Sequence, residues 1–414
     1  MAELADKKRE NSFIEYTPLN LLTESFEVGD LYDAKKRQFL HAGKLFHTPA
    51  KWVPQDVAEY DYLVDNNVSN RIDKLDVTAN MKASFLAGAV EVTGSAKYLD
   101  SDREDAASHT MHVIYKGKKG TMELDTNVYQ LPPKDLRVKN ACATHVISKI
   151  IMGYNVATTL SISKESGTEE KNVAGSLEIA VKAIAAAGAG DVDLSTFSDH
   201  MKKNVSVRIS GDFELTGLPQ TLEKVADFTN NLPKLVKDCN GAKGVPKKVF
   251  LVPLTLFTGL PNPEHAPVHS IKNYTLNSMS TLMVELEELA MMCEELKILN
   301  KIKKLEKDSP QRCWSAQTQE HLQNFGREVK SNHISIQDRL RPALEKLYAD
   351  NDEGDVVKIL HDSLEEKEGA CYVLRTKGAR WLSYVREHIE HLQAISQRIK
   401  RLDENLVQSR WASP

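Results

Sequence analysis

Residues 140–163, NACATHVISKIIMGYNVATTLSIS, form the stretch that decides which fold this sequence predicts. The stretch is rich in β-branched residues and contains no proline, so it is typical of a strand. Strands usually have about 5–6 residues, so a run of this length is expected to bend. Its single glycine, Gly153, lies in the middle, where glycine often marks a bulge or a close backbone approach. The sequence therefore predicts a long central strand that bends at Gly153.

Short motifs in and around this strand resemble a known family. Thr144, His145 and Gly153 resemble the Thr-His…Gly signature of the membrane-attack-complex/perforin and cholesterol-dependent cytolysin superfamily, with Tyr154 in place of its second glycine. The segments KASFLAGAVEVTGSAKYLD (82–100), ATHVISKIIMG (143–153) and KKVFLVPLTL (247–256) resemble the stonustoxin and verrucotoxin branch. The resemblance covers about residues 11–300 and the helical segments that follow. It implies a soluble subunit that assembles into a pore.

Composition narrows the function classes. The 414 residues allow two or three domains, and a net charge of −4 does not favour nucleic acid as a partner. Five scattered cysteines argue against a disulfide framework. The N-terminal residues MAELADKKRE lack an apolar core, and no run of about 18 apolar residues occurs. We therefore expect a protein that is cytoplasmic as synthesised, released by a non-classical route, and membrane-associated only after a change of shape.

Two blocks flank the central strand, at residues 76–109 and 174–203. In the first, Phe85, Ala89 and Val92 have helical spacing, and a strand over residues 110–116 follows, with Met111, Val113 and Tyr115 on one face. In the second, an alanine-rich segment over residues 174–190 precedes a helical pattern over 191–201. The alternating residues 204–213 then predict a half-buried antiparallel strand.

The alanine-rich segment fits two periods. As a helix, Val173, Leu177, Val181 and Ile184 share one face; as a strand, the odd positions are apolar, whereas Glu178 and Lys182 lie on the even face. Both alternatives stay open: a helix clamped on a sheet, or a segment that unfurls into a membrane hairpin. The candidate membrane-inserting residues are Phe85, Leu86, Val90, Val92, Val173, Leu177, Val181, Ile184, Ala185 and Phe197.

The C-terminal part predicts helices. Residues 219–232 read as a helix that Pro233 interrupts, and residues 248–254 read as a strand. A cluster of prolines near 257–268 then marks a boundary between a domain of residues 1–262 and a helical bundle of residues 263–414. Pro310, Pro342 and the acidic stretch 350–355 are expected to separate the helices. The resemblance implies a bundle of focal-adhesion-targeting type, and we expect the thioredoxin-like and SPRY-type domains of the toxins to be absent.

No catalytic constellation is evident, so we predict no enzyme, no cofactor and no small-molecule substrate. His388 and His391 have a metal-compatible spacing, but His388 lies on an apolar seam without a third ligand, and we expect a packing role. His145 is expected to be a core histidine. The predicted fold class is α+β, with a bent, mostly antiparallel sheet, two clamped helical clusters and an all-α bundle. The expected partners are membrane lipid and the same or a paralogous subunit, with a non-lytic intracellular scaffold as the alternative function.

Overall fold

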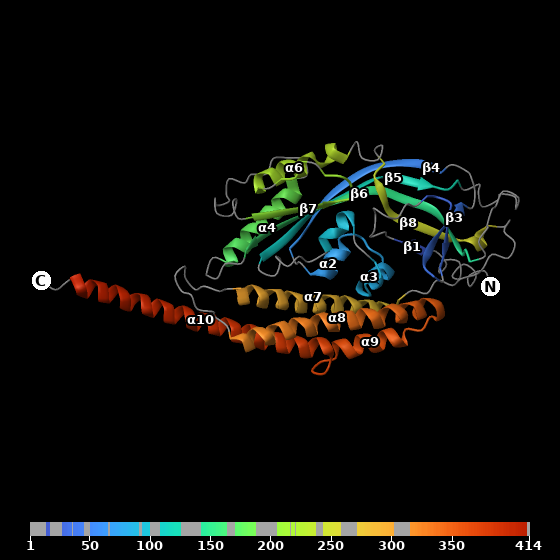
Figure 1. Ribbon diagram of the computed structural model, residues 1–414. Helices are drawn as coiled ribbons and strands as arrows, with labels where there is room; N and C mark the ends of the chain where they lie inside the picture. Colours follow the sequence, from blue (N-terminus) through green and yellow to red (C-terminus); the bar gives the residue numbers. More distant parts are fainter. Residues whose placement is uncertain are drawn as a thin grey trace. The chain divides into compact units, whose positions relative to one another are not determined.

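The computed structural model describes residues 14–16, 27–34, 36–44, 50–64, 67–90, 93–99, 108–125, 142–163, 170–187, 205–215, 217–219, 221–236, 243–257, 271–301 and 315–411. These residues form an antiparallel sheet with helices on its faces, followed by four helices (Figure 1). The predicted α+β class is confirmed.

The long strand β6, His145–Ser163, is the centre of the sheet (Figure 1). One edge of β6 pairs with β2 and β5, and the other edge pairs with β8 and β7. The two edges can be told apart because the same residues of β6 pair with β2 and β8, or with β5 and β7, at once. All described pairings are antiparallel. The strands are β1 (Ile14–Tyr16), β2 (Asp30–Asp33), β3 (Gln38–Lys44), β4 (Lys51–Leu63), β5 (Ser108–Glu123), β7 (Val205–Gly211) and β8 (Val245–Pro253).

Helices cover both faces of the sheet. The first face carries α4 (Glu170–Ala187) and α6 (Leu222–Leu235), which pack in one apolar cluster with β5, β6 and β7. The opposite face carries α2 (Val68–Asp73), and next to it in sequence come α3 (Ala79–Leu86) and the 3-10 helix η1 (Gly94–Leu99). Strand alternation explains the division, since Met111 and Val113 point to the first face and His112 to the second.

Several predicted elements differ in extent from the observed ones. The predicted strand 110–116 is part of the longer β5, and Met111, Val113 and Tyr115 are all buried as expected. The turn signals and short apolar runs of residues 1–75 predict short strands and loops, but residues 68–73 form α2. Asn67 caps this helix by accepting a hydrogen bond from the backbone N–H of Asn70 at 2.8 Å.

Pro233 and Pro342 were each expected to interrupt a helix, but both lie inside one. Helix α6 continues through Pro233 to Leu235. The carbonyl of Thr229, which Pro233 leaves without its helical donor, accepts a hydrogen bond from the Tyr60 hydroxyl at 3.0 Å. Pro342 likewise lies inside α8 (Ala316–Asp350), where the buried residues Leu340, Leu344 and Leu347 offset its cost.

The remaining helices are α7 (Asn273–Lys301), α9 (Gly354–Leu364) and α10 (Ala370–Trp411). The 3–4 spacing of apolar residues in α7 predicts one buried face, and the structure confirms it: the buried residues are Met279, Leu282, Leu286, Leu289, Cys293 and Leu296. The acidic stretch does separate two helices, since Asn351 has a positive φ of 58° between α8 and α9. Pro310 lies outside the described residues.

The chain packs as two compact units. One contains the sheet, its helices, the first residues of α7 and the stretch Gln337–Lys358. The other contains Leu282–Ile336 and the chain from Ile359 onward. In the second unit, Lys377 of α10 pairs with Glu328 of α8, and Arg375 pairs with Glu285 of α7 at 2.6 Å. The predicted boundary at residue 262 divides the chain into two continuous stretches, whereas each compact unit contains several separate stretches and divides α7, α8 and α9 with the other. Independent folding on either side of residue 262 stays a prediction.

Candidate functional site

Four neighbouring strands carry the candidate site. The sheet contains the row β4, β5, β6, β7, in which each strand pairs antiparallel with the next. Leu63, at the end of β4, pairs with His112, near the start of β5, and Ile162, near the end of β6, pairs with Val205. Ser108 pairs with Ser163, so β5 begins beside the end of β6. The β4–β5 and β6–β7 connections therefore leave the sheet at the same end.

Each connection contains one of the blocks predicted from the sequence. Residues 64–107 join β4 to β5 and include α2, α3 and η1. Residues 164–204 join β6 to β7 and include α4. A pair of adjacent antiparallel strands needs only a short turn. Both connections are much longer than a turn, so each is a helical insertion within what is otherwise a β-hairpin.

Helix α4 is held on the sheet by apolar packing. Leu177, Val181 and Ile184 are fully buried, and Ala185 is nearly so. They share a cluster with Met111, Val113, Leu160, Ile162 and residues of α6. On the solvent side, Glu178 and Lys182 form an ion pair at 2.5 Å, and the side chain of Ile179 is 61% exposed. The segment is thus observed as the amphipathic helix, the first of its two predicted periods.

Residues 64–107 between β4 and β5, called here the first connection, are held in place by a buried arginine. Arg71 of α2 donates from Nη2 to the carbonyl of Leu99 at 3.2 Å, which ties α2 to η1. The charge of Arg71 also acts on His112 of β5, whose Nδ1 lies 3.0 Å from Oγ1 of Thr159. Burial, and then the positive charge of Arg71, lower the pKa of His112 to about 3. The imidazole is therefore neutral at neutral pH, and its protonation would place a second positive charge beside Arg71.

A buried carboxylate, Asp212, joins η1 to the sheet. It follows β7 directly, and its side chain is fully buried. One oxygen accepts from the backbone N–H of Ser95 at 2.9 Å. The other accepts from the backbone N–H of Asn155 and from Nζ of Lys247, both at 2.6 Å. A buried charge is tolerated when it is paired and hydrogen-bonded, as here, so η1, β6 and β8 meet at one carboxylate.

Helix α8 also contacts the first connection within the same compact unit. Nη2 of Arg341 donates to the carbonyl of Gly88, which follows α3, at 3.1 Å. Gly88 has a positive φ of 63°, and a Cβ there would lie 2.8 Å from the Gln337 amide. Any opening of the first connection must therefore break a contact with α8. Sequence reasoning missed both this contact and Asp212, since nothing local distinguishes either residue from ordinary surface charges.

The signature residues Thr144 and His145 are buried where β2, β6 and β8 meet. Oγ1 of Thr144 accepts from the backbone N–H of Ala34 at 2.8 Å and donates to the carbonyl of Tyr32 at 3.1 Å. Nδ1 of His145 lies 2.9 Å from the same oxygen. Because the hydroxyl proton goes to Tyr32, Nδ1 of His145 is the donor in that contact. This network holds the start of the central strand.

Strand irregularities gather beside Gly153. β5 gains a residue between Lys118 and Gly120, and β8 gains one opposite Ile151 and Met152. A Cβ on Gly153 would lie 2.0 Å from the carbonyl oxygen of Gly117, so only glycine fits. Bulges bend and twist strands, and these lie at the position where the sequence predicts the bend.

The other predicted site residues are distributed unevenly. Leu86 is buried in α3, and Phe85 and Val90 are half-buried. Val173 lies in α4, but its side chain, like residues Val92 and Phe197, falls outside what the structure describes. Leu177, Val181, Ile184 and Ala185 come together in one cluster. His388 is half-buried and stacks on Tyr384 with ring centroids 6.1 Å apart.

The described residues contain neither a helix suited to cross a bilayer nor a cluster of side chains suited to hold a metal ion. None of the helices there combines the length and the apolar character that crossing a bilayer requires. No group of three or more His, Cys, Asp or Glu side chains is placed to hold a metal ion within the same residues.

The chain is similar to known toxin subunits. No protein-family model matches the chain. It is 30% identical over 250 residues to cytolytic toxin-alpha of Scorpaena plumieri, covering 57% of this chain and 35% of the toxin. It is 25% identical over 394 residues to stonustoxin subunit alpha of Synanceia horrida, covering 90% of this chain and 52% of that subunit. The chain thus spans about half the length, or less, of these curated relatives.

A solved structure of stonustoxin has the same fold. It superposes with a TM-score of 0.62 over 91% of this chain and 48% of the solved chain, at 19% sequence identity. At that identity the match concerns the fold alone. The sheet and both helical insertions described above therefore belong to a fold already observed in a toxin.

Proposed function

We propose that this chain, a relative of the stonustoxin and verrucotoxin subunits, is a pore-forming subunit that assembles on a membrane with itself or with a paralogous subunit. The relationship confirms the resemblance to this branch that residues 82–100, 143–153 and 247–256 suggested. One observation carries the proposal: both helical insertions leave the same end of four adjacent strands. If each insertion straightened into a hairpin, the four strands would all lengthen in one direction.

The physical reason is the requirement for closed hydrogen bonding in lipid. A transmembrane strand needs about 9–11 residues, and residues 64–107 and 164–204 each exceed two such strands and a turn. Four strands leave two unpaired edges, and an open edge in hydrocarbon leaves backbone groups unsatisfied. Copies of the subunit must therefore join edge to edge into a barrel, so assembly is part of the mechanism.

The α4 segment fits the lipid-facing role in its second period. As a strand, Leu177, Ile179 and Val181 would share one face with Ala185, and Glu178 and Lys182 would share the other. In the helix, Leu177, Val181 and Ala185 are buried in the core, whereas Ile179 is exposed. The same apolar side chains would serve the soluble protein and then the bilayer. Phe85, Leu86, Val90, Val92, Val173, Ile184 and Phe197 complete the set proposed to enter the membrane.

A reversible cross-link tests whether α4 must leave the sheet. Nζ of Lys182 lies 5.8 Å from the Tyr62 ring of β4, and both side chains are exposed. Tyr62→Cys and Lys182→Cys, joined by a reductant-cleavable bis-maleimide, would pin α4 without disturbing the core. Cys142, Cys239 and Cys313 would be replaced by serine so that the cross-linker reacts with the two introduced cysteines, and the buried Cys293 and Cys371 would be kept. The measurement is dye release from liposomes, alone and with a paralogous subunit from the same source.

The pinned protein should bind liposomes but release no dye until reductant is added. The matched control joins Glu328→Cys to Lys377→Cys, an ion pair at 2.5 Å within the helical unit, and should lyse with or without reductant. Lysis by protein whose Tyr62–Lys182 link is intact would exclude the hairpin mechanism. Failure of every variant, including the unlinked protein, to release dye would contradict pore formation and favour a scaffold.

A further inference from the structure

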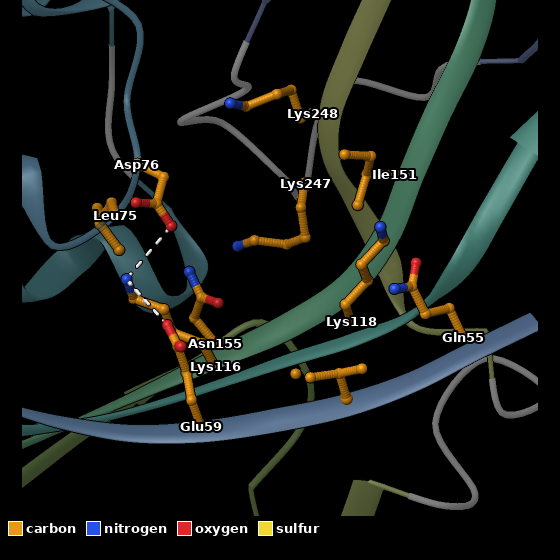
Figure 2. A pocket seen from close by; sticks show the side chains of 12 residues that line it. Gln55, Glu59, Leu75, Asp76, Lys116, Lys118, Ile151, Asn155, Lys247 and Lys248 are labelled. Carbon is orange, nitrogen blue, oxygen red and sulfur yellow. Dashed lines mark hydrogen bonds and ion pairs between the residues drawn. The ribbon is translucent and has the colours of Figure 1, made fainter.

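The pocket in Figure 2 is charged, but its least exposed charges are neutralised within the chain. The lysines that line it are Lys116 and Lys118 of β5 and Lys247 and Lys248 of β8. The dashed lines join Lys116 to Asp76 at 3.2 Å and to Glu59 at 3.6 Å. Lys247 pairs with the buried Asp212 at 2.6 Å. These two lysines therefore need no outside ligand, and the surface that does call for a partner lies on α10.

Helix α10 has a second apolar face besides the one that packs in the bundle. Its buried side chains include Leu382, Val385 and Ile389. By contrast, Val373, Tyr384 and Ile395 are 51%, 48% and 43% exposed. These three residues follow one another in steps of eleven, which is close to three full turns of an α-helix. They therefore lie in one row, on a different side of the helix from the buried residues.

The two halves of this exposed face differ in shape. A hollow of 560 Å³ lies along the N-terminal half, and the aromatic and apolar side chains that line it are Tyr372, Val373, Trp381 and Tyr384. In the C-terminal half, beyond Ile389, none of the side chains that the structure describes is buried. One half is thus recessed, and the other half presents its side chains to solvent.

Two copies of α10 fit each other when they run in opposite directions about Tyr384. Val373 and Ile395 are each eleven residues from Tyr384. An antiparallel pair that brings the two Tyr384 side chains together therefore brings Val373 of each copy opposite Ile395 of the other. The hollow of one copy then receives the C-terminal half of the other. A contact in which both copies use the same patch is the commonest way in which identical chains pair.

The charges beside the row favour the antiparallel direction. Arg380 and Glu387 are both exposed, and at about 100° of rotation per residue they lie on the same flank of the row. They are four and three residues from Tyr384, in opposite directions along the helix. In an antiparallel pair, Arg380 of each copy therefore meets Glu387 of the other, so that two ion pairs form. A parallel pair would instead place each of these residues at the level of its like-charged counterpart.

The aromatic residues on the other flank follow the same rule. Trp381 and His388 lie there, three and four residues from Tyr384 in opposite directions. In the antiparallel pair, Trp381 of each copy therefore lies beside His388 of the other. Apolar residues, aromatic residues and charges thus all match in one arrangement, and this match identifies a second copy of the chain as the partner.

We propose that the chain forms a two-fold dimer in which this face of α10 packs antiparallel on the same face of a second copy. From Val373 to Ile395 the face is about 33 Å long, at about 1.5 Å per residue. A single helix pair of this length gives an interface at the small end of the known range, about 1,200 Å² or less, so the dimer should be reversible. A two-fold contact closes at two copies. It is therefore distinct from edge-to-edge assembly of a barrel and does not depend on pore formation.

Sedimentation velocity of the full chain over about 1–100 μM tests the proposal, because a reversible dimer of micromolar Kd changes its population over that range. Arg380→Glu alone, or Glu387→Arg alone, places like charges at both contacts, so each variant should raise the dimer Kd by about tenfold or more. A mixture of the two variants restores opposite charges at both contacts. The mixture should therefore dimerise as the unaltered chain does, although neither variant does so alone.

The matched controls are Glu320→Arg and Lys330→Glu, which reverse the charges of exposed residues on α8. Each control should dimerise as the unaltered chain does, and circular dichroism should show the same helix content for every variant. A chain that is monomeric at all concentrations would overturn the proposal. So would a dimer that the Arg380 and Glu387 variants leave unchanged, or a mixture of these two variants that stays monomeric.

Discussion

Acid should loosen the first connection through His112, and the size of the effect follows from its burial. In the folded protein the pKa of His112 is about 3, first because the ring is buried and second because Arg71 is close. In the unfolded chain a histidine has a pKa of about 6.5. Between these values the unfolded state binds one more proton than the folded state, so the free energy of unfolding falls as pH falls.

The magnitude can be worked out for an experiment. Each pH unit below about 6.5 favours the unfolded state by about 1.36 kcal/mol for this one group. Lowering the pH from about 7.5 to about 5 should therefore remove about 2 kcal/mol of stability. The lost stability should first concern Arg71, whose charge acts on the ring, and η1, to which Arg71 is hydrogen-bonded, before it concerns the rest of the sheet.

Urea unfolding of the unaltered chain and of His112→Gln at several pH values isolates this contribution from that of the other histidines. Glutamine cannot be protonated and retains a polar group near Thr159, 3.0 Å from the ring nitrogen that it replaces. The variant should lose about 2 kcal/mol less than the unaltered chain between about pH 7.5 and about pH 5. His361→Gln is the control, since that side chain is 66% exposed. Parallel pH profiles for the chain and His112→Gln would refute the reasoning.

Three further predictions concern the sheet and the domain division. Gly153→Val should lower the soluble yield and the melting temperature, because its Cβ would meet the Gly117 carbonyl at 2.0 Å; unchanged melting would count against it. Asp212→Asn should cost about 3–5 kcal/mol in urea unfolding and speed hydrogen exchange at the Ser95 amide, whereas the exposed Asp227→Asn should change neither. A fragment of residues 265–414 should give a helical circular dichroism spectrum and melt cooperatively; a disordered spectrum would place its core in contact with the sheet unit.

Local patterns predicted the elements well. The alternation in residues 204–213 and the long run that ends at Ser163 gave β7 and β6, and the spacing from Met279 to Leu296 gave the buried face of α7. Such periods follow from the geometry of one strand or one helix, so a single stretch of sequence contains them. The prolines were misleading because a partner outside the helix decides what they cost. Tyr60 satisfies the carbonyl that Pro233 leaves, and Tyr60 is far away in the sequence.

The sequence by itself determined the long central strand, its glycine, the two apolar periods of residues 174–190 and the resemblance to the toxins. The tertiary structure alone decided that both helical insertions leave the same end of four strands, that Asp212 joins three segments, and that four lysines share a pocket. The physical reason is register. Which residues meet across a sheet depends on the pairing of distant strands and on single-residue bulges, and one residue of shift moves a side chain to the other face.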